Sequence, residues 1–275
     1  MKQRIIAATE SYWRSRLPDL GARVEQALRQ VEDILTLEDY NRRSREGDQP
    51  LGKALGSFGA QVLNLSSLSG VLERGYASRE VQKDRLQRVR LLAETLRAAK
   101  VQLRDTPPAC HFFEFDGDAT RVMEAFEAHM APAAKTMAAV RAAGLEARGH
   151  YAHGQHDAYF KAFDWRQLDN EEISLSAPFM VFAEPTAHLG EYLGPLLEIV
   201  TSGRPVKIAL LQSRLFPAQH ESGRAAVLQG MPDPALLFLA LRNVFFLQGS
   251  SALEDRLQSG IEAGLASIRP AVLSV

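Results

Sequence analysis

The 275-residue sequence contains a single cysteine, Cys110. One cysteine excludes a disulfide within the chain, and it excludes any zinc or iron–sulfur site built only from cysteines of this chain. We therefore expect no iron–sulfur cluster on this chain and a reducing compartment around it.

The sequence also lacks an excess of charge of one sign and a long apolar run. Lys and Arg total 32 against 33 Asp and Glu, a formal net charge of -1, which gives no overall field to attract nucleic acid or an anionic membrane. Residues 1–16 have neither the apolar core nor the cleavage pattern of a signal peptide. The most apolar stretch, 234–248, is interrupted by Arg242 and Asn243 and is too short to cross a bilayer. We predict a cytoplasmic protein with no nucleic-acid or membrane partner.

The first hundred residues have a helical pattern. Over residues 5–103, apolar side chains recur at spacings of three and four, as in helices with one buried face. The pattern predicts a helix over 17–37 with Pro18 and Asp19 in its first turn, a loop over 41–53 and a short helix around 62–72. A further helix is expected over 79–100, capped by Ser78. Residues 105–108, Asp-Thr-Pro-Pro, are the clearest linker signal.

The pattern changes in the second half. A short strand is expected over 111–115, then a helix from Asp118 to about Ala143 closed by Gly144, then an irregular stretch over 150–170. From residue 178 onward, strands over 179–183, 206–211, 244–247 and 270–275 alternate with helices over 189–201, 233–241 and 253–266. This alternation is typical of an α/β fold with a parallel sheet. We divide the chain into a helical region 1–105, a connecting region 106–177 and an α/β unit 178–275. Because the chain ends within a predicted strand, we expect it to be part of something longer.

Two clusters have side chains suited to catalysis or metal binding. Asp116 and Asp118 follow an apolar strand in the order Asp-Gly-Asp-Ala-Thr, which resembles the opening motif of haloacid-dehalogenase-type phosphohydrolases. In that family the first Asp is the nucleophile and the second a general acid/base, with Mg²⁺ holding the phosphate. No acidic pair ends a later strand, so a turn followed by a helix cap is the other reading.

The second cluster is histidine-rich. His150, His153, His156 and Asp157 have a spacing that suits Zn²⁺ or Fe²⁺ on one helical face. Gly149 and Gly154 argue against a regular helix there, and a polar surface loop is the alternative. We assign no metal site from the sequence.

The α/β region has a family resemblance. The segments PFMVFAEPTAHLGEYLGPLLEIVTSGRPVKIALLQS (178–213) and LALRNVFFLQGSSALEDRLQSGIEAGLASIRPAVLSV (239–275) resemble the thiamine-diphosphate domain of pyruvate:ferredoxin oxidoreductases and related 2-oxoacid:acceptor oxidoreductases. The resemblance implies a thiamine-diphosphate-type parallel sheet, thiamine diphosphate and Mg²⁺ as cofactors, and iron–sulfur clusters on other domains or subunits. It places the cofactor contacts at Glu184, Thr186, His188 and Gly190.

The sequence departs from this family at the metal ligands. Aligned by Ser202-Gly203, the family's Gly-Asp-Gly falls at residues 184–186, so that Pro185 stands at the Asp position, and the later Asn falls near Lys207. Proline offers no ligand and lysine has the wrong charge for Mg²⁺.

We therefore expect a fragment or subunit of a 2-oxoacid:acceptor oxidoreductase-like protein, with a degenerate cofactor domain that has lost thiamine diphosphate and Mg²⁺ and is inactive alone. Its partners would be the other oxidoreductase domains or subunits, and a homo-oligomer remains open. The alternatives are a non-catalytic module that binds a partner through the helices over 17–37 and 79–103, and a phosphohydrolase that uses Asp116 and Asp118.

Overall fold

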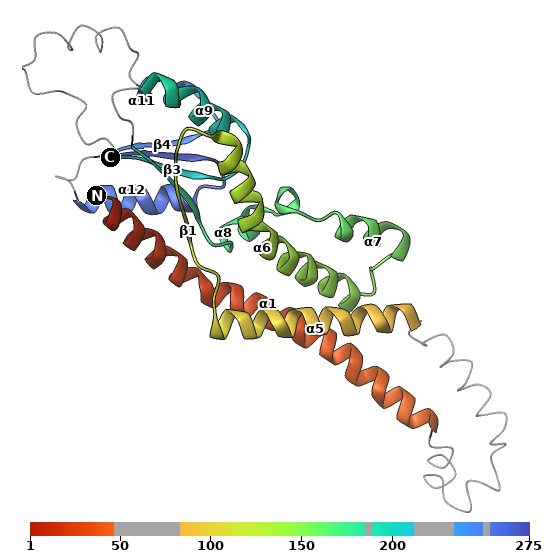
Figure 1. Ribbon diagram of the computed structural model, residues 1–275. Coiled ribbons are helices and arrows are strands. Elements are labelled where there is room, and N and C mark those ends of the chain that lie inside the picture. Colours follow the sequence, from red (N-terminus) through yellow and green to blue (C-terminus); the bar gives the residue numbers. More distant parts are fainter. Residues whose placement is uncertain (47–82, 185–188, 212–233, 250–253) are drawn as a thin grey trace, which may run out of the picture. The chain divides into compact units, whose positions relative to one another are not determined.

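The computed structural model describes residues 1–46, 83–184, 189–211, 234–249 and 254–275. It is an α/β protein with a five-stranded, all-parallel sheet in the order β1-β2-β3-β5-β4 (Figure 1). The elements are α1 (Lys2–Glu46), α5 (Lys83–Asp105), β1 (His111–Glu114), α6 (Ala119–Ala147), α7 (His153–Lys161), the 3₁₀ helix η1 (Trp165–Gln167), α8 (Asn170–Ser174), β2 (Phe179–Ala183), α9 (Leu189–Thr201), β3 (Lys207–Leu210), α11 (Pro234–Ala240), β4 (Phe245–Gln248), α12 (Glu254–Ala266) and β5 (Ala271–Ser274).

The three inner strands form the core of the sheet. Every residue of β2, β3 and β5 is buried, as their continuous apolar runs predict for strands covered on both faces. The residues of the edge strands β1 and β4 are half-buried or exposed. The four strands and three helices predicted beyond residue 178 are therefore confirmed, each within a few residues of its expected bounds.

Helices cover both faces of the sheet (Figure 1). Met180 and Phe182 point to one face, where they pack with Ile5 of α1 and with Leu257 and Ile261 of α12. The alternate residues point to the opposite face, where the ring of Phe179 lies 5.6 Å from that of Phe126 in α6 and the ring of Phe246 lies 6.2 Å from that of Phe238 in α11. Glycines bring α12 close to the sheet, since a Cβ at Gly260 would lie 2.6 Å from Leu247.

Strand β1 belongs to this sheet although it lies in the region 106–177. It pairs in parallel with β2 along its whole length, with His111 opposite Phe179 and Glu114 opposite Phe182. The indole Nε1 of Trp13 donates to the carbonyl of Pro108, so the start of α1 holds the chain just before β1.

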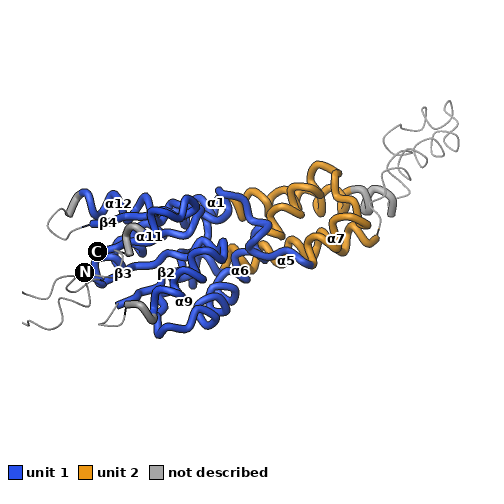
Figure 2. Tube along the Cα trace, turned by 90° about the horizontal axis from the view of Figure 1, so that it is seen from above, with its two compact units in different colours: residues 1–22, 102–137, 162–275 blue, residues 23–101, 138–161 orange. Residues whose placement is uncertain are grey.

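The chain forms two compact units, which Figure 2 distinguishes by colour. Unit 1 comprises residues 1–22, 102–137 and 162–275 and contains the sheet. Unit 2 comprises residues 23–101 and 138–161, and the elements in its described residues are helices. Within unit 2, α1 and α5 run in opposite directions, since Glu25 pairs with Lys100 at 3.0 Å and Glu32 with Arg97 at 2.8 Å. No helix of the described residues is both long enough and apolar enough to cross a membrane.

Three boundaries predicted from the sequence are wrong. Helix α1 begins at Lys2, continues through Pro18 and includes residues 41–46, which were expected to start a loop. Pro18 is exposed while Trp13 and Leu20 are buried, so burial of the apolar face holds the helix together and water can reach the backbone that the proline leaves unpaired. Helix α6 continues past Gly144 and ends before Gly149, whose φ of 68° suits glycine.

The stretch over 150–170, expected to be irregular, contains α7, η1 and the start of α8. Short capping boxes at Asp164 and Asp169 start η1 and α8, a local signal that the sequence contained. The predicted helix over 62–72, the cap Ser78 and most of the predicted loop over 41–53 lie outside the described residues.

Candidate functional site

The carboxyl ends of β1 and β2 place two acidic residues at neighbouring positions. In parallel sheets, ligands bind at the edge where the strands end. The pairing of these strands continues one residue past β1, where the amide of Phe115 donates to the carbonyl of Phe182 at 2.9 Å. Asp116 and Glu184 therefore follow the ends of adjacent strands, and Glu184 is exposed.

A tight turn follows β1 and leads into α6. Gly117 adopts a φ of 98°, which favours glycine. The carboxylate of Asp118 accepts the amides of Thr120 at 2.9 Å and Arg121 at 3.2 Å, which confirms Asp118 as the cap of this helix. Asp116 accepts the amide of Asp118 at 3.3 Å and forms an ion pair with the Arg121 side chain. Both carboxylates thus stabilise the turn; their use in phosphate hydrolysis stays a prediction.

The residues expected to contact a cofactor are only partly described. Glu184 lies directly after β2, and Gly190 is the second residue of α9, the helix that follows. Thr186 and His188 lie outside the described residues. Glu114, the last residue of β1, pairs with Lys2 at 2.5 Å. The described part of this edge therefore presents carboxylates, and the two cations seen beside them, Lys2 and Arg121, are already paired.

Lys207 is not at the metal-ligand position that the alignment assigned to it. It begins β3 and so lies at the amino edge of the sheet, one strand length from Glu184. The residue that follows β3 at the carboxyl edge is Leu211, whose amide donates to Ala183 at 2.9 Å. The structure therefore places Lys207 at the edge of the sheet opposite Glu184.

Lys207 is instead a buried cation that sequence reasoning missed. Its side chain is 4% exposed, and Nζ donates to the carbonyls of Ser267 and, at 3.1 Å, Arg269. Burial lowers the pKa of Lys207 to about 7 from its ordinary value of 10.5. The signal was present in the sequence as a lysine between Val206 and Ile208 at the start of an apolar strand.

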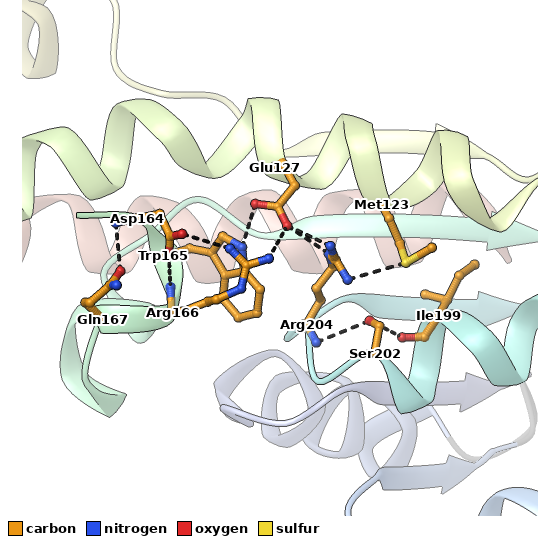
Figure 3. A network of polar contacts seen from close by, with 9 residues as sticks. All are labelled: Met123, Glu127, Asp164, Trp165, Arg166, Gln167, Ile199, Ser202 and Arg204. Carbon is orange, nitrogen blue, oxygen red and sulfur yellow. Dashed lines mark hydrogen bonds and ion pairs between the residues drawn. The ribbon is translucent and has the colours of Figure 1, made fainter. Parts of the chain in front are cut away.

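The turn between α9 and β3 belongs to a polar network (Figure 3). Glu127 of α6 accepts Arg204 Nη2 at 2.7 Å, Trp165 Nε1 at 2.6 Å and Arg166 Nη2 at 3.1 Å. Ser202 donates to the carbonyl of Ile199 at 2.7 Å. Ser202 and Gly203, on which the alignment was based, and the adjacent Arg204 thus have a structural role: they end α9 and tie the turn to α6.

The histidine cluster does not converge on one point. His153 pairs with Asp157 at 2.5 Å, while His156 Nδ1 lies 2.8 Å from the amide of Ala152. Asp157 also accepts the hydroxyl of Tyr151 at 2.8 Å. Among the described residues no group of three or more His, Cys, Asp or Glu side chains could hold a metal ion.

Cys110 is placed against α1 and is a poor nucleophile. Its Sγ lies 3.8 Å from the carbonyl of Thr9, and burial raises the pKa of the thiol to about 12 from 9.0. At any pH below 9 the thiolate fraction is then about a thousandfold smaller than for an unperturbed thiol.

At pH 8 we expect Cys110 of the native protein to react with a disulfide reagent such as DTNB about a thousandfold more slowly than Cys110 of protein unfolded in about 6 M urea. The measurement is the absorbance of the released thiolate with and without urea. Equal rates in the two states would show that the cysteine is accessible and ionised.

Comparison of the chain with protein-family models, curated proteins and solved structures gives no match. A functional proposal therefore rests on the chemistry of the residues and on the resemblance noted in the sequence.

Proposed function

We propose that unit 1 binds a diphosphate-bearing ligand through a divalent cation at the carboxyl edge of β1 and β2. Thiamine diphosphate is the ligand that the family resemblance implies. The chain would serve as the cofactor-binding part of a larger 2-oxoacid:acceptor oxidoreductase-like assembly and would have no activity alone.

The observation that supports this proposal is the position of Asp116 and Glu184 after adjacent, paired strands. Carboxylate oxygens suit Mg²⁺, which is commonly held by one or two carboxylates and by the phosphates of its ligand. The same carboxylates would repel a diphosphate without a metal between them. Binding should therefore require the cation.

Three residues at this edge, Glu184, Asp116 and Arg121, would form the protein side of the metal–diphosphate site. Glu184 would hold the metal with a carboxylate that is exposed, whereas Asp116 would first have to give up part of its pairing with Arg121. Arg121, once released, would lie in the first turn of α6, where its positive charge favours phosphate. The cofactor itself would supply the stabilisation of the substrate carbanion, and acceptors on other chains would take the electrons.

The test is calorimetric titration of the chain with thiamine diphosphate, with and without Mg²⁺. We expect saturable binding only in the presence of Mg²⁺, weakened about tenfold or more by Glu184→Gln and by Asp116→Asn. The matched control is Glu198→Gln, which removes an exposed carboxylate from the far end of α9 and should bind like the wild type.

Inorganic pyrophosphate separates the two parts of the proposal. Equal affinities for pyrophosphate and thiamine diphosphate would support the metal–diphosphate site and remove the thiamine assignment. The absence of heat with either ligand at millimolar concentration, Mg²⁺ present, would overturn the proposed function.

A further inference from the structure

A small pocket lies at the opposite, amino edge of the sheet. It has a volume of about 30 Å³, which is room for about two water molecules or a ligand of three or four heavy atoms. Its walls come from α1, α6, α8, α12 and the starts of β2 and β3. Most are apolar, including Phe126, Met130, Ile173, Phe179 and Leu265.

Lys207 of β3 and Tyr12 of α1 both line this pocket. Two of the three N–H groups of the Lys207 ammonium are used by the carbonyls of Ser267 and Arg269. The third has no partner among the described residues. Lysine can only donate, so a ligand next to it must accept.

Two further donors are buried and have no hydrogen-bond partner in the described part of the chain, one on Tyr12 in the pocket lining and one on Arg16, the residue one helical turn further along α1. They are the hydroxyl oxygen of Tyr12 and Nε of Arg16, both shielded from solvent. The Arg16 guanidinium carbon lies 5.3 Å from the centre of the Tyr12 ring. Buried donors without acceptors are costly and uncommon in native proteins.

We propose that this pocket binds a small carboxylate, of the size of formate or acetate, between Lys207 and Tyr12. One carboxylate oxygen would accept from Lys207 Nζ and the other from the Tyr12 hydroxyl, with the Arg16 guanidinium over the Tyr12 ring. The three serines of the lining already donate to backbone carbonyls. The remaining polar groups are donors, two of them on basic side chains, and the volume of about 30 Å³ suits an acid of three or four heavy atoms. The site is separate from the carboxyl edge and does not depend on the proposed function.

The chemistry of Lys207 supports an anion as the occupant. Burial favours the neutral amine of Lys207 and destabilises the ammonium form. A carboxylate beside it would reverse this effect, because an opposite charge at hydrogen-bond distance stabilises the charged form.

The test is the melting temperature and calorimetric titration of the full chain with sodium formate and sodium acetate, at constant ionic strength set with sodium chloride. We expect a saturable rise in melting temperature with either carboxylate and none with benzoate, which is too large. Lys207→Met should abolish the rise and the heat of binding. Tyr12→Phe should weaken binding about tenfold.

Tyr12→Phe also distinguishes a loss of binding from a loss of folding. Because the hydroxyl has no partner in the described residues, its removal should leave the melting temperature in chloride unchanged or higher, while the response to formate falls. Lys83→Met, which removes an exposed lysine of α5, is the control and should respond like the wild type. The proposal would be overturned if binding did not saturate by about 100 mM formate, which is about the limit of useful affinity. Equal responses in all variants would overturn it as well.

Discussion

Replacing Glu146 with alanine is expected to lower the free energy of unfolding by about 3 kcal/mol. Glu146 lies near the end of α6 and is 1% exposed. Its two carboxylate oxygens accept Nε of Arg85 and Nε of Arg88, both at 2.7 Å, and its carbonyl accepts Arg85 Nη2 at 2.9 Å. The substitution leaves two guanidinium groups beside each other without their counter-charge. Because these arginines keep partial access to solvent, the loss should lie at the low end for a buried ion pair.

The measurement is urea unfolding followed by circular dichroism. Glu32→Ala is the matched control, because Glu32 also pairs with an arginine of α5 in the same unit but is exposed. This control should lose less than about 1 kcal/mol. A triple variant, Glu146→Leu with Arg85→Met and Arg88→Met, should recover most of the loss, since it leaves no buried charge unpaired. Similar losses for Glu146→Ala and Glu32→Ala would contradict the buried cluster.

Lys207 is expected to make the stability of the protein depend on pH above neutrality. Its pKa is about 7 in the folded protein, against 10.5 for an ordinary lysine. Between these values the unfolded chain binds a proton that the folded chain does not, so the free energy of unfolding rises with pH. The contribution of Lys207 to the free energy of unfolding is constant below about pH 7 and above about pH 10.5. Over the full window it amounts to about 5 kcal/mol, and from pH 7 to 9 to about half of that.

The difference between wild type and Lys207→Met isolates this contribution. We expect the variant to be more stable than the wild type near pH 7, where the buried ammonium is most costly, and the difference to fall by about half as the pH rises to 9. Urea unfolding at half-unit steps of pH gives both curves. Lys83→Met, at an exposed position of α5, should run parallel to the wild type. A pH-independent difference between wild type and Lys207→Met would show that the lysine stays charged in the folded protein. The experiment is done without small carboxylates, which would stabilise the ammonium if they bind.

Much of the local structure followed from the sequence because its causes are local. The apolar runs 179–183 and 206–211 are buried strands, Asp118 caps α6, and Gly203, with a φ of 78°, ends the turn after α9. Each of these depends on a few neighbouring residues: a burial pattern, a capping carboxylate or a backbone angle that favours glycine. Where the local signal competed with burial, as at Pro18 and Gly144, the buried face of the helix decided the outcome.

The sequence by itself determined the class of the fold, an α/β chain with parallel strands, and the acidic character of Asp116 and Glu184 at two strand ends. The tertiary structure alone decided that β1 lies beside β2, that β5 lies between β3 and β4, and that Lys207 starts its strand at the opposite edge. It also decided that Glu146 meets two arginines and that Tyr12 and Lys207 share a pocket. The reason is that strand order and side-chain clusters join residues far apart in the chain, where no periodicity or spacing in the sequence records which neighbour is chosen.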